Sequence, residues 1–311
     1  MNSNQKNHFM NCAFPADADI LPAYDDRIFK TLLTHPDAER VLIDVVSTLI
    51  ERKVVSVQVR NIEPPVTDIE EKNERFDVNC TVENGDQIDV EMHSSERVEI
   101  GKKRINFINK YVYYLTDLHS SQKSRGKEYD ELVKTYQVTF CTHNIFPARK
   151  DFVSRFSLRD KNGKELSDQI NMVIIELDRL NEAMNKPVEK LTSFEKWSMF
   201  FKFASDPVYR SKINDIINNK EEIGMAATLL REISQDERER AILRSRRMYE
   251  TDMTSDRLAS ERKGEIRGLK KGIKKGLKQG LKQGLKQGHV EVLELLEQGL
   301  TIEEIKSRLT Q

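Results

Sequence analysis

The stretch RFDVNCTVENGDQIDVEMH, residues 75–93, decides the fold of this chain. Two runs of alternating apolar and polar residues flank the turn Glu83-Asn84-Gly85-Asp86, which is typical of a β-hairpin. A two-residue turn would place Val78 opposite Glu91 and would mix polar with apolar side chains on both faces. A three-residue loop with Gly85 in the left-handed conformation separates the two kinds of side chain. The sequence therefore predicts a hairpin with the three-residue loop.

In this register each face of the hairpin has one character. The apolar face consists of Phe76, Val78, Cys80, Val82, Ile88, Val90 and Met92. The polar face sets Asp77 opposite Glu91, Asn79 opposite Asp89 and Arg75 opposite His93. Opposed residues have Cβ atoms about 5 Å apart, so two carboxylates there destabilise a sheet unless a cation lies between them. Mg²⁺ and Mn²⁺ prefer such oxygen ligands. The alternative is a solvated polar face whose acids pair with lysines, and the hairpin alone leaves both readings open.

The segments outside the hairpin predict a mixed sheet covered by helices. The expected strands are 54–59, 75–82, 87–93, 135–142 and 172–177, and the expected helices are two within 26–52, then 97–120, 191–203 and 221–247. The two helices within 26–52 are separated at His35-Pro36, because the residue before a proline disfavours the helical conformation. This order of elements indicates an α/β fold.

Composition is that of an ordinary globular protein. The chain has 311 residues, 38% of them apolar, and its 51 basic and 51 acidic side chains cancel, so any charged surface must be local. No segment has the length and apolar character of a membrane helix, and the first residues lack a signal-peptide pattern. We therefore expect a cytoplasmic protein with no membrane partner. The three cysteines form no CxxC pair and are expected to be free thiols.

Five segments are expected along the chain. They are a flexible tail at 1–20, the α/β core at 21–180, a helical region at 181–260, a basic linker with glycine at every fourth position at 261–288, and a small helical cap at 289–311. Within the cap, Thr301-Ile302-Glu303-Glu304 is a capping-box sequence and predicts the start of a last helix.

Several separated motifs point to a known family. They are Asp26-Arg27-Ile28-Phe29-Lys30, Arg75-Phe76-Asp77-Val78 with Ile88-Asp89-Val90-Glu91-Met92-His93, Arg104 with Tyr113 or Tyr114 downstream, Gly126-Lys127-Glu128-Tyr129, Leu191-Thr192 with Glu195-Lys196-Trp197, and the Gly-x-x-x tail. Together, over residues 21–290, they resemble the Rpn family of recombination-promoting nucleases and transposases, a branch of the PD-(D/E)XK superfamily. The resemblance implies a restriction-endonuclease-like core, a mixed sheet flanked by helices, followed by an α-helical C-terminal region. It also implies metal-dependent cleavage of DNA, with Asp77 and Glu91 as metal ligands and Asp26 as a helix-borne acid near the site.

One residue of the implied site departs from the family pattern. His93 stands where this family usually has Gln and where most of the superfamily has Lys. An imidazole can hydrogen-bond a water as Gln does, but it ordinarily titrates near neutral pH and can bind a metal. Arg104 is expected either to contact a phosphate or to form a structural ion pair. Trp197 lies close to three phenylalanines in the sequence, so we expect it in the core and not as a platform for stacking bases.

The glycine repeat carries the local charge that the whole chain lacks. Residues 260–288 have a net charge of +8. This segment is either a basic arm that contacts DNA phosphates, through Lys270, Lys271, Lys274 and Lys275, or a spacer kept in solution by its lysines. Glycine costs about 1 kcal/mol at each helical position, and a four-residue repeat moves the apolar stripe around the helix. We therefore expect a flexible or partly helical linker and not an ordered oligomerisation helix, although the C-terminal helical region remains a candidate for homo-oligomer contacts.

These features predict an endonuclease that hydrolyses DNA with Mg²⁺ or Mn²⁺ and promotes recombination or transposition through the breaks it makes. Its expected catalytic residues are Asp77, Glu91, His93 and Asp26. The first alternative is a DNA-binding or assembly protein of the same fold that has lost catalysis. The second is a structural or regulatory module whose polar hairpin face is only solvated.

Overall fold

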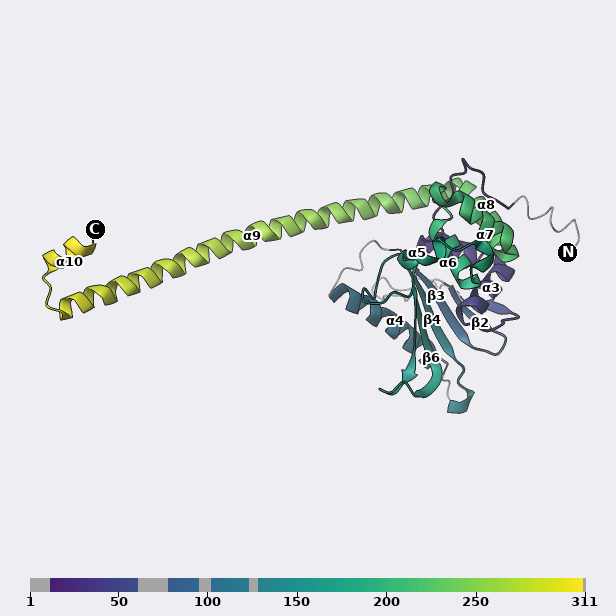
Figure 1. The fold of residues 1–311 in the computed structure, drawn as a ribbon, viewed down its shortest axis with the longest axis horizontal. Helices are drawn as coiled ribbons and strands as arrows, with labels where there is room; N and C mark the ends of the chain where they lie inside the picture. Colours follow the sequence, from purple (N-terminus) through teal and green to yellow (C-terminus); the bar gives the residue numbers. More distant parts are fainter. Residues whose placement is uncertain (1–11, 61–77, 95–101, 123–127, 310–311) are drawn as a thin grey trace, which may run out of the picture. The chain divides into compact units, whose positions relative to one another are not determined.

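The computed structural model describes residues 12–60, 78–94, 102–122 and 128–309 (Figure 1). The chain divides into two compact units, residues 1–240 and 241–311. The first unit contains the sheet and the helices packed on it. The second contains most of one long helix and a short terminal one.

A mixed six-stranded sheet forms the centre of the first unit. Its strands are β1 (Val57–Val59), β2 (Val78–Val82), β3 (Gln87–His93), β4 (Thr135–Cys141), β5 (Val153–Arg159) and β6 (Glu165–Glu176), in the order β1-β2-β3-β4-β6-β5. The three central strands β3, β4 and β6 are parallel, and the pairs at both edges are antiparallel. The expected α/β fold with a mixed sheet flanked by helices is confirmed.

The hairpin formed by β2 and β3 has the predicted register. Asn79 lies opposite Asp89, and Gly85 adopts a φ of +88°, the left-handed conformation that the three-residue loop requires. The Gly85 N–H donates to the Val82 carbonyl at 2.8 Å and closes the turn. Residues 75–77, including the predicted pair of Asp77 with Glu91, lie outside the described residues.

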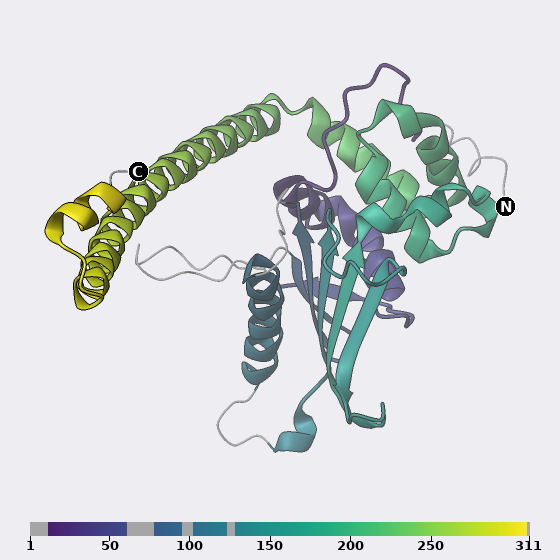
Figure 2. The same ribbon diagram turned by 60° about the vertical axis from the view of Figure 1, so that its left-hand side comes forward.

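A single helix, α4 (Lys102–Ser120), runs along one face of the sheet (Figure 2). Phe107, Tyr111 and Leu115 recur every four residues on the buried side of this helix. They pack against Cys141 on β4 and Ile174 on β6. This face of the sheet is therefore covered, and the alternative of a solvated polar face is wrong for the described residues: Asn79, Asp89 and Glu91 on β2 and β3 are buried.

The opposite face of the sheet packs against helices drawn from both ends of the first unit. Those in contact with the sheet are α2 (Asp26–Leu33), α3 (Glu39–Leu49) and α6 (Ser193–Phe203). Two further helices, α7 (Arg210–Asn219) and α8 (Glu221–Gln235), pack on these helices. Phe29 of α2 and Phe201 of α6 meet Phe140 of β4, with ring centroids 5.8 and 5.3 Å from it. Trp197 is buried in the same core, as expected, and donates from Nε1 to Asp44 at 2.7 Å.

The N-terminal segment and the helical segment both belong to this core. Phe14 and Ile20 are buried, and Asn214 of α7 forms hydrogen bonds of 2.9 Å with both the N–H and the carbonyl of Phe14. The expectation of a flexible tail is therefore wrong for residues 12–20. Likewise, the helices between residues 181 and 240 share one compact unit with the sheet, so no structural boundary separates them from the core at residue 180.

Five of the described elements differ from the expected ones. β5 was not expected, and β6 begins well before the predicted strand because the two form a long hairpin with each other. The short helix α5 (Asn181–Met184) and α7 were not expected either. The single helix predicted at 221–247 is interrupted at Asp236, whose carboxylate accepts hydrogen bonds from the N–H groups of Arg238 and Glu239 and so starts a new helix.

The new helix, α9 (Glu237–Glu297), includes the whole glycine repeat (Figure 1). The expected flexible or partly helical linker is therefore corrected to a helix that continues through the whole repeat. Between the glycines stand mainly Leu, Lys and Gln, which are strong helix formers, and no proline follows residue 207. The helix ends before Gly299, which has a φ of +84°, and the predicted capping box of Thr301 and Glu304 starts α10 (Ile302–Leu309).

Among the described helices, none combines the length and the apolar character needed to cross a membrane.

Candidate active site

The candidate site lies at the carboxyl ends of the parallel strands. β3, β4 and β6 end at His93, Cys141 and Glu176, which are neighbours in the sheet. In open α/β sheets the carboxyl ends of parallel strands are the usual place for ligands, because the loops there surround a crevice. Glu91, two residues before the end of β3, points to the face covered by α4, as its pairing with Thr139 shows.

Glu91 is a buried carboxylate with a lysine beside it. Its exposed fraction is only 3%. The Nζ of Lys110, on α4, lies 4.0 Å from Glu91 Oε2, which is close enough for electrostatic attraction but too far for a hydrogen bond. The same Nζ lies 4.8 and 5.0 Å from the ring centres of Tyr111 and Tyr114. Because the lysine side chain remains 43% exposed, its charge stands at the boundary between the buried acid and solvent.

His93 packs among aromatic rings at the end of β3. Its ring centre is 4.8 Å from that of Phe107, and its Nδ1 is 3.5 Å from the Tyr111 hydroxyl. Burial, together with the positive charges of Lys110 and His143, lowers the pKa of His93 from 6.5 to about 4, although the negative charge of Asp26 opposes this shift. The expectation that this imidazole titrates near neutral pH is therefore wrong. It is neutral at pH 7 because removing a charged imidazolium from water is costly.

The first turn of α2 brings Asp26 within electrostatic reach of His93. Asp25 caps this helix by accepting hydrogen bonds from the N–H groups of Arg27 and Ile28, which fixes where the helix starts. The Arg27 guanidinium is held in turn by two hydrogen bonds of 2.7 Å to Glu239. Asp26 therefore lies on the first turn of a helix near the end of β3, and its role in the site stays a prediction.

A row of buried polar groups continues from Glu91 along the sheet. Gln137 Nε2 donates to Asp89 Oδ2 at 2.7 Å, and both residues are fully buried. Within the described part of the chain, Gln137 Oε1 and the Thr139 hydroxyl have no hydrogen-bond partner. Buried polar atoms without protein partners ordinarily bind water or ions, so this row offers places for bound water directly beside Glu91.

Two residues of this neighbourhood were not predicted from the sequence. Lys110 is one, and the available signal was its position next to the buried Tyr111 on an amphipathic helix. The other is His143, which follows β4, lies within hydrogen-bonding distance of the Thr142 hydroxyl at 2.9 Å, and contributes to the lowered pKa of His93. No sequence signal pointed to His143, because it reaches the site only through the parallel pairing of β3 with β4.

Not all predicted site residues can be placed. Asp77 lies outside the described residues, and so does the side chain of Arg104. Without Asp77, the described residues contain no group of three or more His, Cys, Asp or Glu side chains arranged to hold a metal ion.

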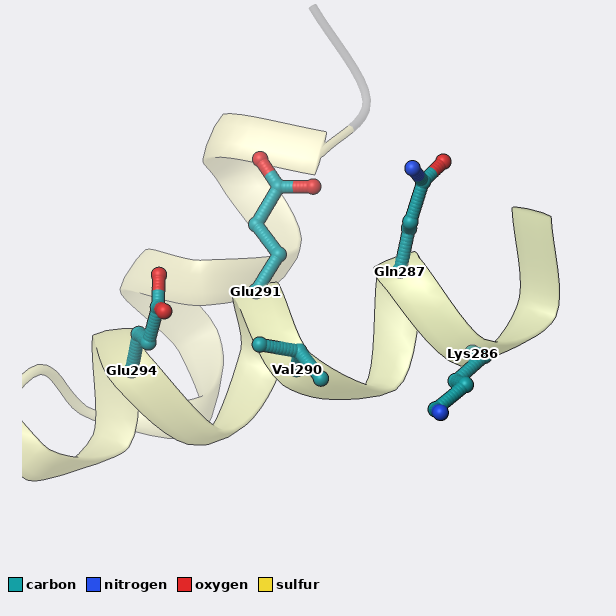
Figure 3. Close-up of a pocket in the computed structure, with 5 residues that line it drawn as sticks. All are labelled: Lys286, Gln287, Val290, Glu291 and Glu294. Atoms are coloured by element: carbon teal, nitrogen blue, oxygen red, sulfur yellow. The ribbon is translucent and has the colours of Figure 1, made fainter. Parts of the chain in front are cut away.

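The predicted DNA-binding lysines lie in the second unit. Lys270, Lys271, Lys274 and Lys275 are exposed on α9. Figure 3 shows where the basic segment of this helix ends: Lys286, its last lysine, points away from the side that carries Gln287, Glu291 and Glu294. The groove between these side chains is an open helix surface, and no lysine follows Lys286 in α9.

Comparison with known proteins assigns the fold to a family. A family model described as PD-(D/E)XK nuclease family transposase matches residues 23–258, which include the sheet, α2, α4 and the first part of α9. Neither the curated proteins nor the solved structures contain a significant match to the chain.

Proposed function

The chain belongs to the PD-(D/E)XK nuclease family transposases, and on that premise we propose that it is a metal-dependent endonuclease that hydrolyses DNA phosphodiester bonds. The observation that carries the proposal is the buried carboxylate of Glu91 at the carboxyl end of a parallel strand, flanked by Lys110 and His93. A fold alone does not establish a reaction, so the proposal depends on these groups.

The oxygen donors at this place suit a hard divalent cation. The observed hairpin register, continued by one residue, predicts Asp77 opposite Glu91, and the hydroxyl of Thr139 is the next oxygen along the sheet. We propose that Asp77 and Glu91 hold Mg²⁺ or Mn²⁺. When bound, such an ion supplies Lewis-acid chemistry, since it draws electron density from phosphate oxygens and water.

The protein's own groups then have separate tasks. Hydrolysis joins the oxygen of one water to phosphorus and breaks the bond from phosphorus to a sugar oxygen, which takes up a proton. With a pKa near 4, His93 is neutral at pH 7, so it can orient a water by hydrogen bonding but adds no positive charge to the site. Asp26 would help to set the orientation of the imidazole from the first turn of α2.

DNA contacts outside the cleavage site would come from basic side chains. We propose Arg104 and the exposed lysines of α9, Lys270, Lys271, Lys274 and Lys275, as contacts to phosphates. A segment with a charge of +8 releases counterions from DNA when it binds, which makes such binding sensitive to salt. Breaks made by this enzyme would promote recombination or transposition.

One observation favours a second candidate. His93 replaces the Gln or Lys expected at its position, and a chain that has lost this group could keep the fold and bind DNA without cutting it. The alternative function is therefore a catalytically degenerate DNA-binding or assembly protein.

Plasmid cleavage by the purified full chain tests both candidates. The reaction is run with Mg²⁺, Mn²⁺, Ca²⁺ or EDTA, beside Asp77→Asn and Glu91→Gln, with Glu182→Gln on an exposed helix as the matched control. Cutting that requires Mg²⁺ or Mn²⁺ and falls on the order of 10³-fold or more in the two site variants, but not in the control, would support the nuclease and its acids. DNA binding without cutting in any metal would support the degenerate protein.

A further inference from the structure

Lys110 is the positive charge nearest to the carboxylate of Glu91 among the residues whose side chains are described. It comes from α4, a helix that follows the hairpin in the chain and lies across the polar face of the sheet. The short motif on β3 that carries Glu91 and His93 therefore receives its cation from a different element.

The position of this lysine is set by the packing of α4. Phe107 and Tyr111 anchor the helix on the sheet, so the residue just before Tyr111 must project along the flank of the buried side. Its Nζ lies near two tyrosine rings, at 4.8 and 5.0 Å, and cation–π attraction at these distances restrains the ammonium group. The ammonium group is thus held beside the acid while part of it still faces solvent.

His93 does not occupy this place. The imidazole stacks edge-on against Phe107 and contacts the Tyr111 hydroxyl, whereas the lysine stands at the exposed margin of the site. A phosphate that approaches Glu91 from solvent would meet the ammonium group before it met the imidazole. A point charge with three rotatable donors is well suited to bind such a phosphate.

We propose that Lys110 is a catalytic residue, which binds the scissile phosphate and supplies from α4 the positive charge that most enzymes of this superfamily carry on β3 itself. This role rests on the proposed nuclease function. The task of Lys110 is to stabilise the negative charge that builds up on the phosphate oxygens during attack by water. Removal of one positioned donor with this task typically costs about 10²–10³-fold in rate.

The competing explanation is that Lys110 only neutralises Glu91 when no metal is bound. The two explanations differ in what happens when the charge is removed. If the lysine is catalytic, Lys110→Met loses cutting but still binds a divalent cation, and does so at least as well as the parent because no positive charge competes for Glu91. If the lysine is only a counter-ion, Lys110→Met cuts as well as the parent.

The test uses the full chain and two readouts. Single-turnover cleavage of plasmid DNA in Mn²⁺ is measured for the parent, Lys110→Met, Lys110→Arg and the control Lys161→Met, an exposed lysine in the turn between β5 and β6. The rise in melting temperature on addition of Mn²⁺ alone is measured for the same proteins. We expect Lys110→Met to cut about 10²-fold more slowly or worse, Lys110→Arg to cut faster than Lys110→Met, the control to match the parent, and the Mn²⁺ shift to be retained in all four.

The results distinguish a failure of the proposed role of Lys110 from a failure of the proposed nuclease function. Cutting by Lys110→Met within threefold of the parent overturns the catalytic role and leaves the nuclease proposal standing. Loss of the Mn²⁺ shift together with cutting also overturns it, because the lysine would then support the fold or the metal site and not the phosphate. A parent chain that cuts in no metal overturns the nuclease proposal itself, and the role of Lys110 falls with it.

Discussion

Burial of His93 makes the stability of the first unit depend on pH. The pKa of His93 is about 4 in the folded chain and 6.5 when the chain is unfolded. Between these values the unfolded chain binds a proton that the folded chain does not, so stability falls as the pH decreases. This loss of stability is absent well above pH 6.5, grows as the pH falls below 6.5, and is complete below pH 4. At pH 5 the loss amounts to about 2 kcal/mol, which lowers the melting temperature of a unit of this size by roughly 4–8 °C.

The variant His93→Gln isolates this effect. Glutamine is the residue that the family usually has here, and it does not titrate. The variant therefore lacks the loss of stability at low pH that His93 causes. The melting temperatures of parent and variant are measured in EDTA at pH 7.5 and pH 5.0. Between these two pH values the melting temperature of the parent should fall by roughly 4–8 °C more than that of the variant. His289→Gln, at an exposed position of α9, controls for the loss of a histidine as such. Equal falls in parent and His93→Gln would refute the reasoning, because they would mean that His93 is not held neutral by its surroundings.

Two further predictions concern the core and the basic helix. Trp197→Phe removes the hydrogen bond from Nε1 to Asp44 and is expected to lower the free energy of unfolding by about 1–3 kcal/mol, measured by urea denaturation; an unchanged midpoint would contradict this. Replacing Lys270, Lys271, Lys274 and Lys275 by Gln in the full chain should weaken DNA binding and reduce the slope of log K against log salt by up to about 3–4, measured by fluorescence anisotropy at several NaCl concentrations. A slope equal to that of the parent would show that α9 makes no phosphate contacts through these residues.

The hairpin shows what kind of structure can be predicted from one sequence. Its register follows from alternation with a period of two and from the need for a left-handed residue at Gly85, and both are properties of neighbouring residues. The capping box at Thr301 is equally local. Patterns of this kind were confirmed because no distant segment is needed to specify them.

Elements that depend on distant partners were predicted less well. β5 is an edge strand with an exposed, mixed pattern, and it is recognisable mainly through its pairing with β6. The glycine repeat is a separate case: it was expected to be flexible or only partly helical because of its glycines, but the strong helix formers between the glycines maintain α9. The segment around Phe14 was expected to be a tail, because the residues that hold it, Phe200 and Asn214, lie far away in the sequence.

The candidate site likewise has a part that local sequence predicts and a part that depends on the packing of distant segments. The sequence alone predicted Glu91, His93 and Asp26 as site residues and a register that sets Asp77 opposite Glu91. It also identified the family, because the motifs of the family are carried by spacing within short segments. Only the tertiary structure decided that the polar face is buried under α4, that Lys110 stands 4.0 Å from Glu91, and that burial together with Lys110 and His143 lowers the pKa of His93 to about 4. Burial and charge contacts are set by which elements pack together, and that packing joins residues whose separation along the chain carries no local signal.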